Sequence, residues 1–264
     1  MEILGYICAM LIGVSLGTLG SGGSILTVPI MVYLMGISPV TATGYSLFVV
    51  GLTSLFGWAD YMRKKLVHLK TALIYALPSL VSVFLTRKYL MPLIPDVIFS
   101  SGSFILHKNL FIMLLFALLM VAVAYNMIST AKYKDEQEIK TTHYGYIILI
   151  GFFTGILTGI VGIGGGFLII PALVFFARIP IKMSVGTSLM IIAANSFIGF
   201  AGELSTGAFI DWMFLFKFSA FAIAGIILGS KISSAVPAEK LKHAFGWFVL
   251  VMGVCILVRE ILFS

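Results

Sequence analysis

Charged residues are scarce in this chain: they make up 10% of its 264 residues, whereas 60% are apolar. A soluble globular protein is about half apolar and about a quarter charged, so a chain of this length could not bury so many apolar side chains in one core. The mean hydropathy of +1.13 agrees. This composition excludes a water-soluble enzyme and predicts an all-α, polytopic membrane protein.

Cysteine and histidine are also rare. The two cysteines, Cys8 and Cys255, each stand inside an apolar run near opposite ends of the chain, which predicts packing positions rather than a disulfide or a ligand. The four histidines have no metal-ligand spacing, and no glycine-rich stretch is followed by the Lys-Ser/Thr of a phosphate-binding loop. We therefore expect no enzyme activity, no cofactor and no metal site.

Apolar runs mark ten candidate membrane segments, two of them short. A helix needs roughly 20 apolar residues to cross the hydrocarbon core, and fewer where it is broken. The runs are Ile3–Leu19, Ser24–Met35, Val40–Ala59, Leu69–Leu90, Leu106–Thr130, Tyr144–Val161, Phe167–Ala177, Met183–Ala201, Phe209–Ile232 and Leu241–Leu262. A polar stretch divides them, so we expect a first membrane repeat at residues 1–130, a cytoplasmic linker at 131–142 and a second repeat at 143–264.

An internal repeat relates the two halves at a constant offset of 142 residues. Eight of the fourteen matches are to glycine or proline, which chance agreement between apolar helices does not explain. The matched residues are Gly13, Gly17, Gly20, Gly22, Gly23, Leu26, Pro29, Val32, Ile37, Gly44, Ser46, Leu47, Ser54 and Gly57 with Gly155, Gly159, Gly162, Gly164, Gly165, Leu168, Pro171, Val174, Ile179, Gly186, Ser188, Leu189, Ser196 and Gly199. We therefore predict a duplication.

The distribution of lysine and arginine predicts the orientation of the segments. If all ten segments cross, twelve of these charges face one side and four, namely Arg87, Lys88, Lys108 and Arg259, face the other; if the short segments turn back, the division is eight and eight. Cytoplasmic loops carry the excess of Lys and Arg, which favours ten crossings. Five per half is odd, so we predict two inverted repeats of five, with short interrupted segments 2 and 7. The charges follow topology, and nucleic acid is not an expected partner.

Two glycine-rich loops, at residues 20–24 and 162–166, interrupt the repeats at equivalent places, each directly before a short helix. Glycine lets the backbone unwind and approach a ligand, and a helix N-terminus offers unpaired N–H groups and a positive dipole end. Both features suit an anion, and interrupted helices between inverted repeats are typical of secondary transporters. Inversion lets the two N-termini point at a common centre. The alternative is that the glycines serve close packing alone.

The chain resembles the TauE/SafE family of sulfite exporters and related permeases. The resemblance rests on the two glycine loops, G-x-x-G-x-G-G-[SG]-x-[LF], on the proline soon after each loop, and on the signatures at residues 43–47 and 185–189. The resemblance covers almost the whole chain. It implies passage of sulfite, sulfonates or other sulfur-containing organic anions across the inner membrane. The first signature has Tyr45 where the second has Thr187, so the two halves differ in hydroxyl geometry.

Polar residues beside the glycine loops complete the candidate site. Hydroxyl and amide groups can bind an oxyanion without locking it in place, and the alternative for each hydroxyl is a bond to a carbonyl of its own helix. No Lys or Arg falls in the loops or signatures, so we expect helix dipoles and neutral donors to hold the anion. The predicted substrate-binding residues are Gly20, Ser21, Gly22, Gly23, Ser24, Thr43, Tyr45, Ser46, Gly162, Gly164, Gly165, Gly166, Thr187, Ser188 and Asn195.

Ionisable residues in or near the long helices are few, and the sequence points to Asp60, Glu203, Asp211 and Lys217. Proton coupling through Asp60 or Glu203 is physically possible, but an acid at a helix end is more often an interfacial anchor. Lys217 is the fixed cation that the neutral-donor hypothesis has to exclude.

The predicted function is secondary transport of a small sulfur-containing anion, such as sulfite, thiosulfate, a sulfonate or a related organic anion, by alternating access between the repeats. The expected partners are that anion, membrane lipid of a bacterial inner membrane or its equivalent, and a coupling proton or cation that the sequence leaves open. Two alternatives remain: a channel-like facilitator of a similar solute, and a membrane protein that acts in partner assembly or as an intramembrane enzyme.

Overall fold

The computed structural model describes residues 2–19, 23–101, 104–129, 144–162, 166–175, 177, 179–207, 209–232 and 238–263. Nearly all of them are helical. The first half contains α1 (Glu2–Leu19), α2 (Ser24–Pro29), the π-helical turn η1 (Ile30–Leu34), α3 (Pro39–Arg63), α4 (Leu69–Leu85), the π-helical turn η2 (Thr86–Leu90), α5 (Met91–Leu93), β1 (Val97–Ser101), β2 (Phe104–His107) and α6 (Lys108–Ser129). The second half contains α7 (Tyr144–Val161), α8 (Gly166–Phe175), α9 (Ile181–Leu204), α10 (Trp212–Ile232) and α11 (Ala238–Phe263).

The described helices fall in the predicted apolar runs. Four are long and apolar enough to cross a membrane, Pro39–Arg63, Leu69–Leu93, Met183–Leu204 and Trp212–Lys231. Shorter apolar helices occupy Leu4–Thr18, Ser24–Leu34, Lys108–Ala122 and Gly145–Val161. The all-α, multi-pass membrane fold is thus confirmed, whereas the count of ten crossings stays a prediction.

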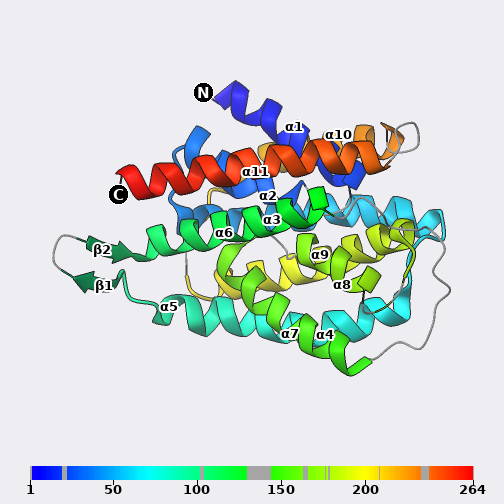
Figure 1. The fold of residues 1–264 in the computed structure, drawn as a ribbon, viewed down its shortest axis with the longest axis horizontal. Helices are drawn as coiled ribbons and strands as arrows, with labels where there is room; N and C mark the ends of the chain where they lie inside the picture. Colours follow the sequence, from blue (N-terminus) through cyan, green and yellow to red (C-terminus); the bar gives the residue numbers. More distant parts are fainter. Residues whose placement is uncertain are drawn as a thin grey trace.

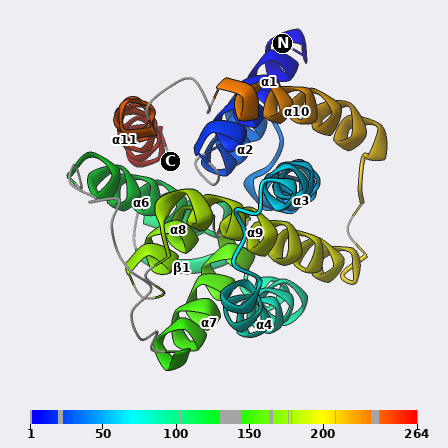
Figure 2. The ribbon, with the colours of Figure 1, turned by 90° about the vertical axis from the view of Figure 1, so that its right-hand side faces the viewer.

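Several helices, among them α3, α4 and α11, run along the long axis of the molecule, and others are tilted to it (Figures 1 and 2). The C-terminus and the β1–β2 hairpin lie toward one end, and the connection from α3 to α4 lies at the other. Figure 2 shows α3 and α9 in the middle, with α10 and α1 on one side of them and α4 and α7 on the other. α6 packs against α11 along a third side. The central pair is therefore enclosed by helices of both halves.

The short hairpin between α5 and α6 was not predicted. β1 and β2 pair antiparallel, with Phe99 opposite Leu106 and Ser101 opposite Phe104. The fifth apolar run begins at Leu106, whereas α6 begins at Lys108. Strands of four or five residues are too short to show a clear alternating pattern next to a long apolar helix.

The central helices α3 and α9 run antiparallel. Along α3, Gly44 lies against Glu203, and thirteen residues later Gly57 lies against Leu189. Between them, a Cβ on Gly51 would lie 3.1 Å from the Cβ of Ser196, so the two helices stay in contact through the middle of both. α3 and α9 are also the helices that the predicted repeat relates.

The helices outside this pair exchange partners between the halves. Gly13 of α1 lies against the carbonyl oxygen of Ala222 in α10, where a Cβ has no room. At the equivalent position of the second half, a Cβ on Gly155 of α7 would lie 2.5 Å from the carbonyl oxygen of Ser79 in α4. Glycine allows both pairs to approach to backbone contact. Each half therefore packs its first helix on a helix of the other half.

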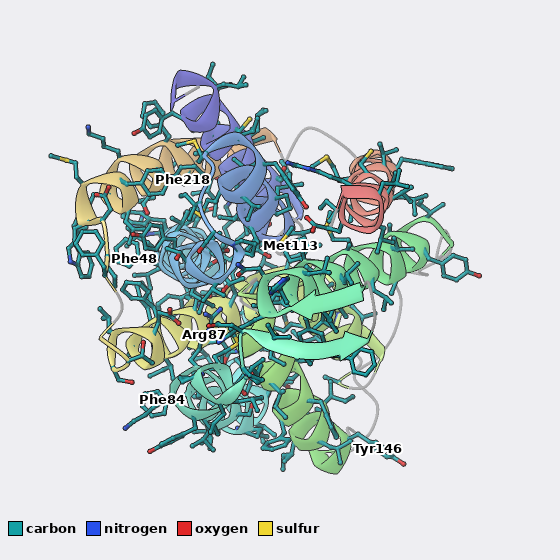
Figure 3. The ribbon with its side chains drawn as sticks, turned by 90° about the vertical axis from the view of Figure 1, so that its left-hand side faces the viewer. Phe48, Phe84, Arg87, Met113, Tyr146 and Phe218 are labelled. Atoms are coloured by element: carbon teal, nitrogen blue, oxygen red, sulfur yellow. The ribbon has the colours of Figure 1, made fainter. Side chains whose placement is uncertain are left out.

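The largest apolar cluster joins α3, α6 and α10, and it includes Phe48, Met113 and Phe218. Figure 3 shows these three side chains inside the bundle, whereas Tyr146 lies at its edge. Large apolar side chains also cover the outside of the described helices; Leu77 is 63% exposed, for example. An apolar exterior of this kind suits lipid rather than water.

Candidate functional site

The described part of the second glycine loop packs against the first half of the chain. Gly162 has a φ of +77°, a conformation that favours glycine. A Cβ there would meet the carbonyl oxygen of Thr43 and come within 2.6 Å of its Cα. Conformation and contact thus both require glycine at this position, and α8 begins shortly afterwards at Gly166. The structure therefore brings two predicted site residues, Gly162 and Thr43, together.

This contact lies near the start of α3, which begins at Pro39. Thr43 precedes Gly51 by eight residues, which corresponds to about 12 Å along a helix. Gly23 packs on α1, where its Cβ position is 2.6 Å from the backbone nitrogen of Leu16, and Ser24 is buried at the start of α2. The remaining predicted loop residues, Gly20, Ser21, Gly22, Gly164 and Gly165, lie outside the described residues, and so does the predicted common centre of the two loops.

Most hydroxyls of the two signatures bond to their own helix. Thr43, Thr187 and Ser188 each donate to a carbonyl three or four residues earlier, at 2.7–2.8 Å. Ser46 differs, because its Oγ is buried and has no partner within the described part of the chain. Of these four hydroxyls, Ser46 is therefore the one with a donor left to give a ligand.

Tyr45 and Thr187 hold helix ends of the opposite half. The Tyr45 hydroxyl accepts a hydrogen bond from the backbone N–H of Asp211 at 2.8 Å, and the Thr187 hydroxyl accepts one from that of His68 at 2.9 Å. Asp211 and His68 in turn cap α10 and α4 with their own side chains. The two non-matching signature residues thus perform equivalent structural tasks, in addition to the ligand role that the sequence predicts for them.

Polar atoms without partners gather on the central helix pair. Ser46 Oγ and Ser54 Oγ on α3, and Asn195 Oδ1 and Ser196 Oγ on α9, are buried and unpaired among the described residues. The amide nitrogen of Asn195 donates to Ser79 Oγ at 2.7 Å. An unsatisfied buried polar group costs about 1–3 kcal/mol, and polar groups inside a membrane protein mark wet or liganded paths. The α3–α9 pair is therefore the best candidate for such a path.

A buried ion pair lies beside this region, and it corrects one expectation. Arg87 Nη1 donates to Glu203 Oε2 at 3.0 Å, and the side-chain exposures are 0% for Arg87 and 14% for Glu203. Arg87 is therefore not the outer loop charge that the sequence predicts, because the helix of α4 continues through η2, which carries Arg87 inward (Figure 3). For Glu203, which the sequence leaves open between proton coupling and an interfacial anchor, the structure adds this ion pair. The available signal was a charged residue before the end of an apolar run.

The other ionisable residues named by the sequence lie at the surface. Asp60 pairs with Lys64 at 2.6 Å, and both side chains are substantially exposed. Asp211 and Lys217 are exposed as well. Among the described residues no group of His, Cys, Asp and Glu could hold a metal ion. Lys217 is thus poorly placed to be the fixed cation of a buried site.

Comparisons with known proteins agree that the chain is similar to membrane transporters. The family model "Sulfite exporter TauE/SafE" matches residues 5–256. A "probable membrane transporter protein" of Xylella fastidiosa (strain 9a5c) is 30% identical over 256 residues, which cover 95% of this chain and 92% of that protein. The "probable membrane transporter protein YunE" of Bacillus subtilis is 27% identical and covers 99% of this chain and 100% of its own length.

The similarity extends to the archaea. The "probable membrane transporter protein MJ0441" of Methanocaldococcus jannaschii is 26% identical, with 94% of each chain covered. No solved structure matches the chain. With the family model spanning almost the whole sequence and full-length relatives named as transporters, this multi-pass membrane protein belongs to the TauE/SafE family of membrane transporters.

Proposed function

We propose that this transporter moves a small sulfur-containing anion, such as sulfite, thiosulfate, a sulfonate or a related organic anion, by alternating access between two inverted repeats. Membership of the sulfite exporter family supports the substrate class. The chemistry of the site supports an anion, because a glycine loop leads into the N-terminus of α8 and a buried hydroxyl without a partner, that of Ser46, lies on α3.

The antiparallel α3–α9 pair is the observation that carries this proposal. Inverted repeats place equivalent helices in opposite directions and form the substrate site between them. α3 and α9 have this relation, with Gly44 against Glu203 at one end and Gly57 against Leu189 toward the other. The exchanged hydrogen bonds of Tyr45 and Thr187 follow the same symmetry. Such an interface suits rocking of one half against the other.

Counterflow in proteoliposomes tests the proposal. Vesicles loaded with unlabelled thiosulfate should transiently accumulate labelled thiosulfate, and sulfite and methanesulfonate should compete, whereas acetate should not. Counterflow requires a site that is exposed alternately to each side, so a channel-like facilitator would equilibrate the label without overshoot. Equal competition by acetate would contradict the sulfur-anion part of the proposal alone.

Cysteine accessibility tests the inversion. After replacement of Cys8 and Cys255, single cysteines at Lys65, Lys134 and Lys240 should all react from the cytoplasmic side, because the predicted ten crossings place these loops together. A membrane-impermeant maleimide on intact cells should label none of the three before lysis. Labelling of any one from outside contradicts the inverted arrangement, whatever the substrate.

A further inference from the structure

One edge of the Arg87 guanidinium has no hydrogen-bond partner among the described residues. Nη1 donates to Glu203, whereas Nε and Nη2 are buried and have no partner among the residues that the structure describes. Nε–H and one N–H of Nη2 point in the same direction along one side of the planar group. This side is the fork that receives two oxygens of a carboxylate, phosphate or sulfonate.

The surroundings make this unpaired edge unusual. Arg87 is completely buried in a segment that is long and apolar enough to cross a membrane. It lies in the π-helical turn η2, and π-turns within α-helices are frequent at functional sites. A charge at such a position is expected to pair with another charge or to mark a substrate path. Glu203 is one such partner, but it accepts from only one of the three guanidinium nitrogens of Arg87, namely Nη1.

The ion pair adjoins the glycine-loop contact. A Cβ on Gly44 would lie 3.1 Å from Glu203 Cγ and 3.3 Å from its Oε1. Gly44 directly follows Thr43, which is the residue that Gly162 touches. The cation, its carboxylate and the described part of the second glycine loop therefore gather at the same end of α3.

We propose that Arg87 recognises the transported anion, with its Nε–Nη2 edge bonding two oxygens of one sulfonyl or sulfite group while Glu203 keeps Nη1. This inference rests on the proposed function and deepens it, because it replaces recognition by neutral donors alone with one fixed cation. Glu203 neutralises the guanidinium when no substrate is bound. Its negative charge also opposes the incoming anion, which limits affinity and favours release.

Changes at Arg87 and Glu203 should move binding in opposite directions. Arg87→Lys keeps a positive charge but loses the two-pronged edge, so half-saturation by thiosulfate and methanesulfonate should rise about ten- to a hundredfold. Glu203→Gln keeps an acceptor for Nη1 and removes the opposing charge, so half-saturation should fall. The exposed pair Asp60→Asn with Lys64→Gln is the matched control and should change neither value.

The double variant Arg87→Gln with Glu203→Gln separates recognition from folding. Removing one partner alone leaves a buried charge, and removing both relieves it, so the double variant should regain a near wild-type melting temperature in detergent. It should still fail to bind thiosulfate. If it binds thiosulfate with wild-type half-saturation, the ion pair is structural and the inference is overturned.

Wild-type protein distinguishes failure of this inference from failure of the proposed function. If wild-type protein transports acetate rather than thiosulfate and Arg87→Lys weakens acetate, the sulfur substrate is wrong and recognition by Arg87 stands. If wild-type protein transports thiosulfate and Arg87→Lys leaves its half-saturation unchanged, the substrate stands and recognition by Arg87 is wrong.

Discussion

The two ends of the α3–α9 pair are built alike and charged differently. At one end Gly44 of α3 lies against Glu203 of α9, and at the other Gly186 of α9 lies against Tyr61 of α3. Gly44 corresponds to Gly186, and Tyr61 to Glu203, at the offset of the repeat. We name these the charged end (Gly44, Glu203) and the neutral end (Gly186, Tyr61).

The difference extends to the neighbouring helices. A Cβ on Gly159 would lie 3.3 Å from the carbonyl oxygen of Val83, and one on the equivalent Gly17 would lie 2.5 Å from that of Ile226. Arg87 follows Val83 by four residues as Ser230 follows Ile226, so these contacts align Arg87 with Ser230. The Ser230 hydroxyl donates to the carbonyl of Ile227 at 3.1 Å. The neutral end thus has a serine bonded to its own helix where the charged end has a buried cation. Among the described residues, close glycine contacts occur at both ends, whereas the buried cation lies at the charged end. Within the described part of the chain, the two ends therefore share their packing and differ in charge.

Gly162→Val, at the charged end, should cause the largest loss of transport and stability. A positive φ costs a side chain about 1–2 kcal/mol, and forcing a Cβ into the backbone of Thr43 adds about 1–3 kcal/mol. We expect loss of transport and a lower melting temperature in detergent. Gly207→Val is the matched control, because Gly207 has a φ of +76° and nothing within 4 Å of its Cβ position. Equal damage by both variants would falsify the loop contact as the cause.

The next largest effect is expected from the serine hydroxyls, whose removal should change apparent affinity at the charged end and not at the neutral end. Ser46→Ala at the charged end removes a donor without a partner among the described residues, and a lost hydrogen bond to a charged ligand weakens apparent affinity by about 1.5–3 kcal/mol, or about ten- to a hundredfold. Ser188→Ala at the neutral end removes a hydroxyl already bonded to Val185. Counterflow half-saturation should change in the first variant only, and an equal change in both contradicts the assignment.

Much of the fold could be predicted because close helix contacts leave glycines in the sequence. Gly13 and Gly155 stand where backbones touch, so any duplication of the contact duplicates the residue and its spacing. The apolar runs likewise follow from the membrane as solvent. The hairpin was missed because each strand is only a few residues long and adjoins a longer apolar run.

The site was harder to predict because its decisive contacts are long-range. Arg87 and Glu203 are 116 residues apart, and no local pattern records such a pair. Arg87 also stands beside Lys88 near the end of an apolar run, so it resembled a loop charge. The roles of Tyr45 and Thr187 as acceptors for helix caps were hidden for the same reason, since each bond joins the two halves of the chain.

Alanine at the equivalent glycines Gly44 and Gly186 should have different effects, on substrate binding at Gly44 and on stability at Gly186. A Cβ on Gly186 would meet the carbonyl oxygen of Leu66 and lie 2.9 Å from Tyr61 Cβ, whereas one on Gly44 meets only the Glu203 side chain, at 3.1 Å or more. Gly186→Ala should therefore lower stability by about 1–3 kcal/mol, measured as the melting temperature in detergent.

Gly44→Ala should be milder for stability, because a side chain can shift more easily than a backbone carbonyl. It should instead alter half-saturation for thiosulfate, since Glu203 moves relative to Arg87. The comparison fails if Gly44→Ala destabilises more than Gly186→Ala, or if the neutral-end variant alone changes half-saturation.

The smallest effects are expected at the hydroxyls that hold the helix caps. Tyr45→Phe removes the acceptor of the Asp211 N–H, and Thr187→Val removes that of the His68 N–H. Each lost hydrogen bond is worth about 0.5–1.5 kcal/mol. Asp211 is exposed, whereas His68 is half-buried, so water replaces the lost partner more readily after Tyr45→Phe. Thr187→Val should therefore lower the melting temperature in detergent more than Tyr45→Phe, and thiosulfate half-saturation should stay unchanged in both. A Tyr45→Phe protein with normal melting and weakened thiosulfate binding would instead place the Tyr45 hydroxyl on the substrate at the charged end, because loss of a structural bond cannot change affinity while sparing stability.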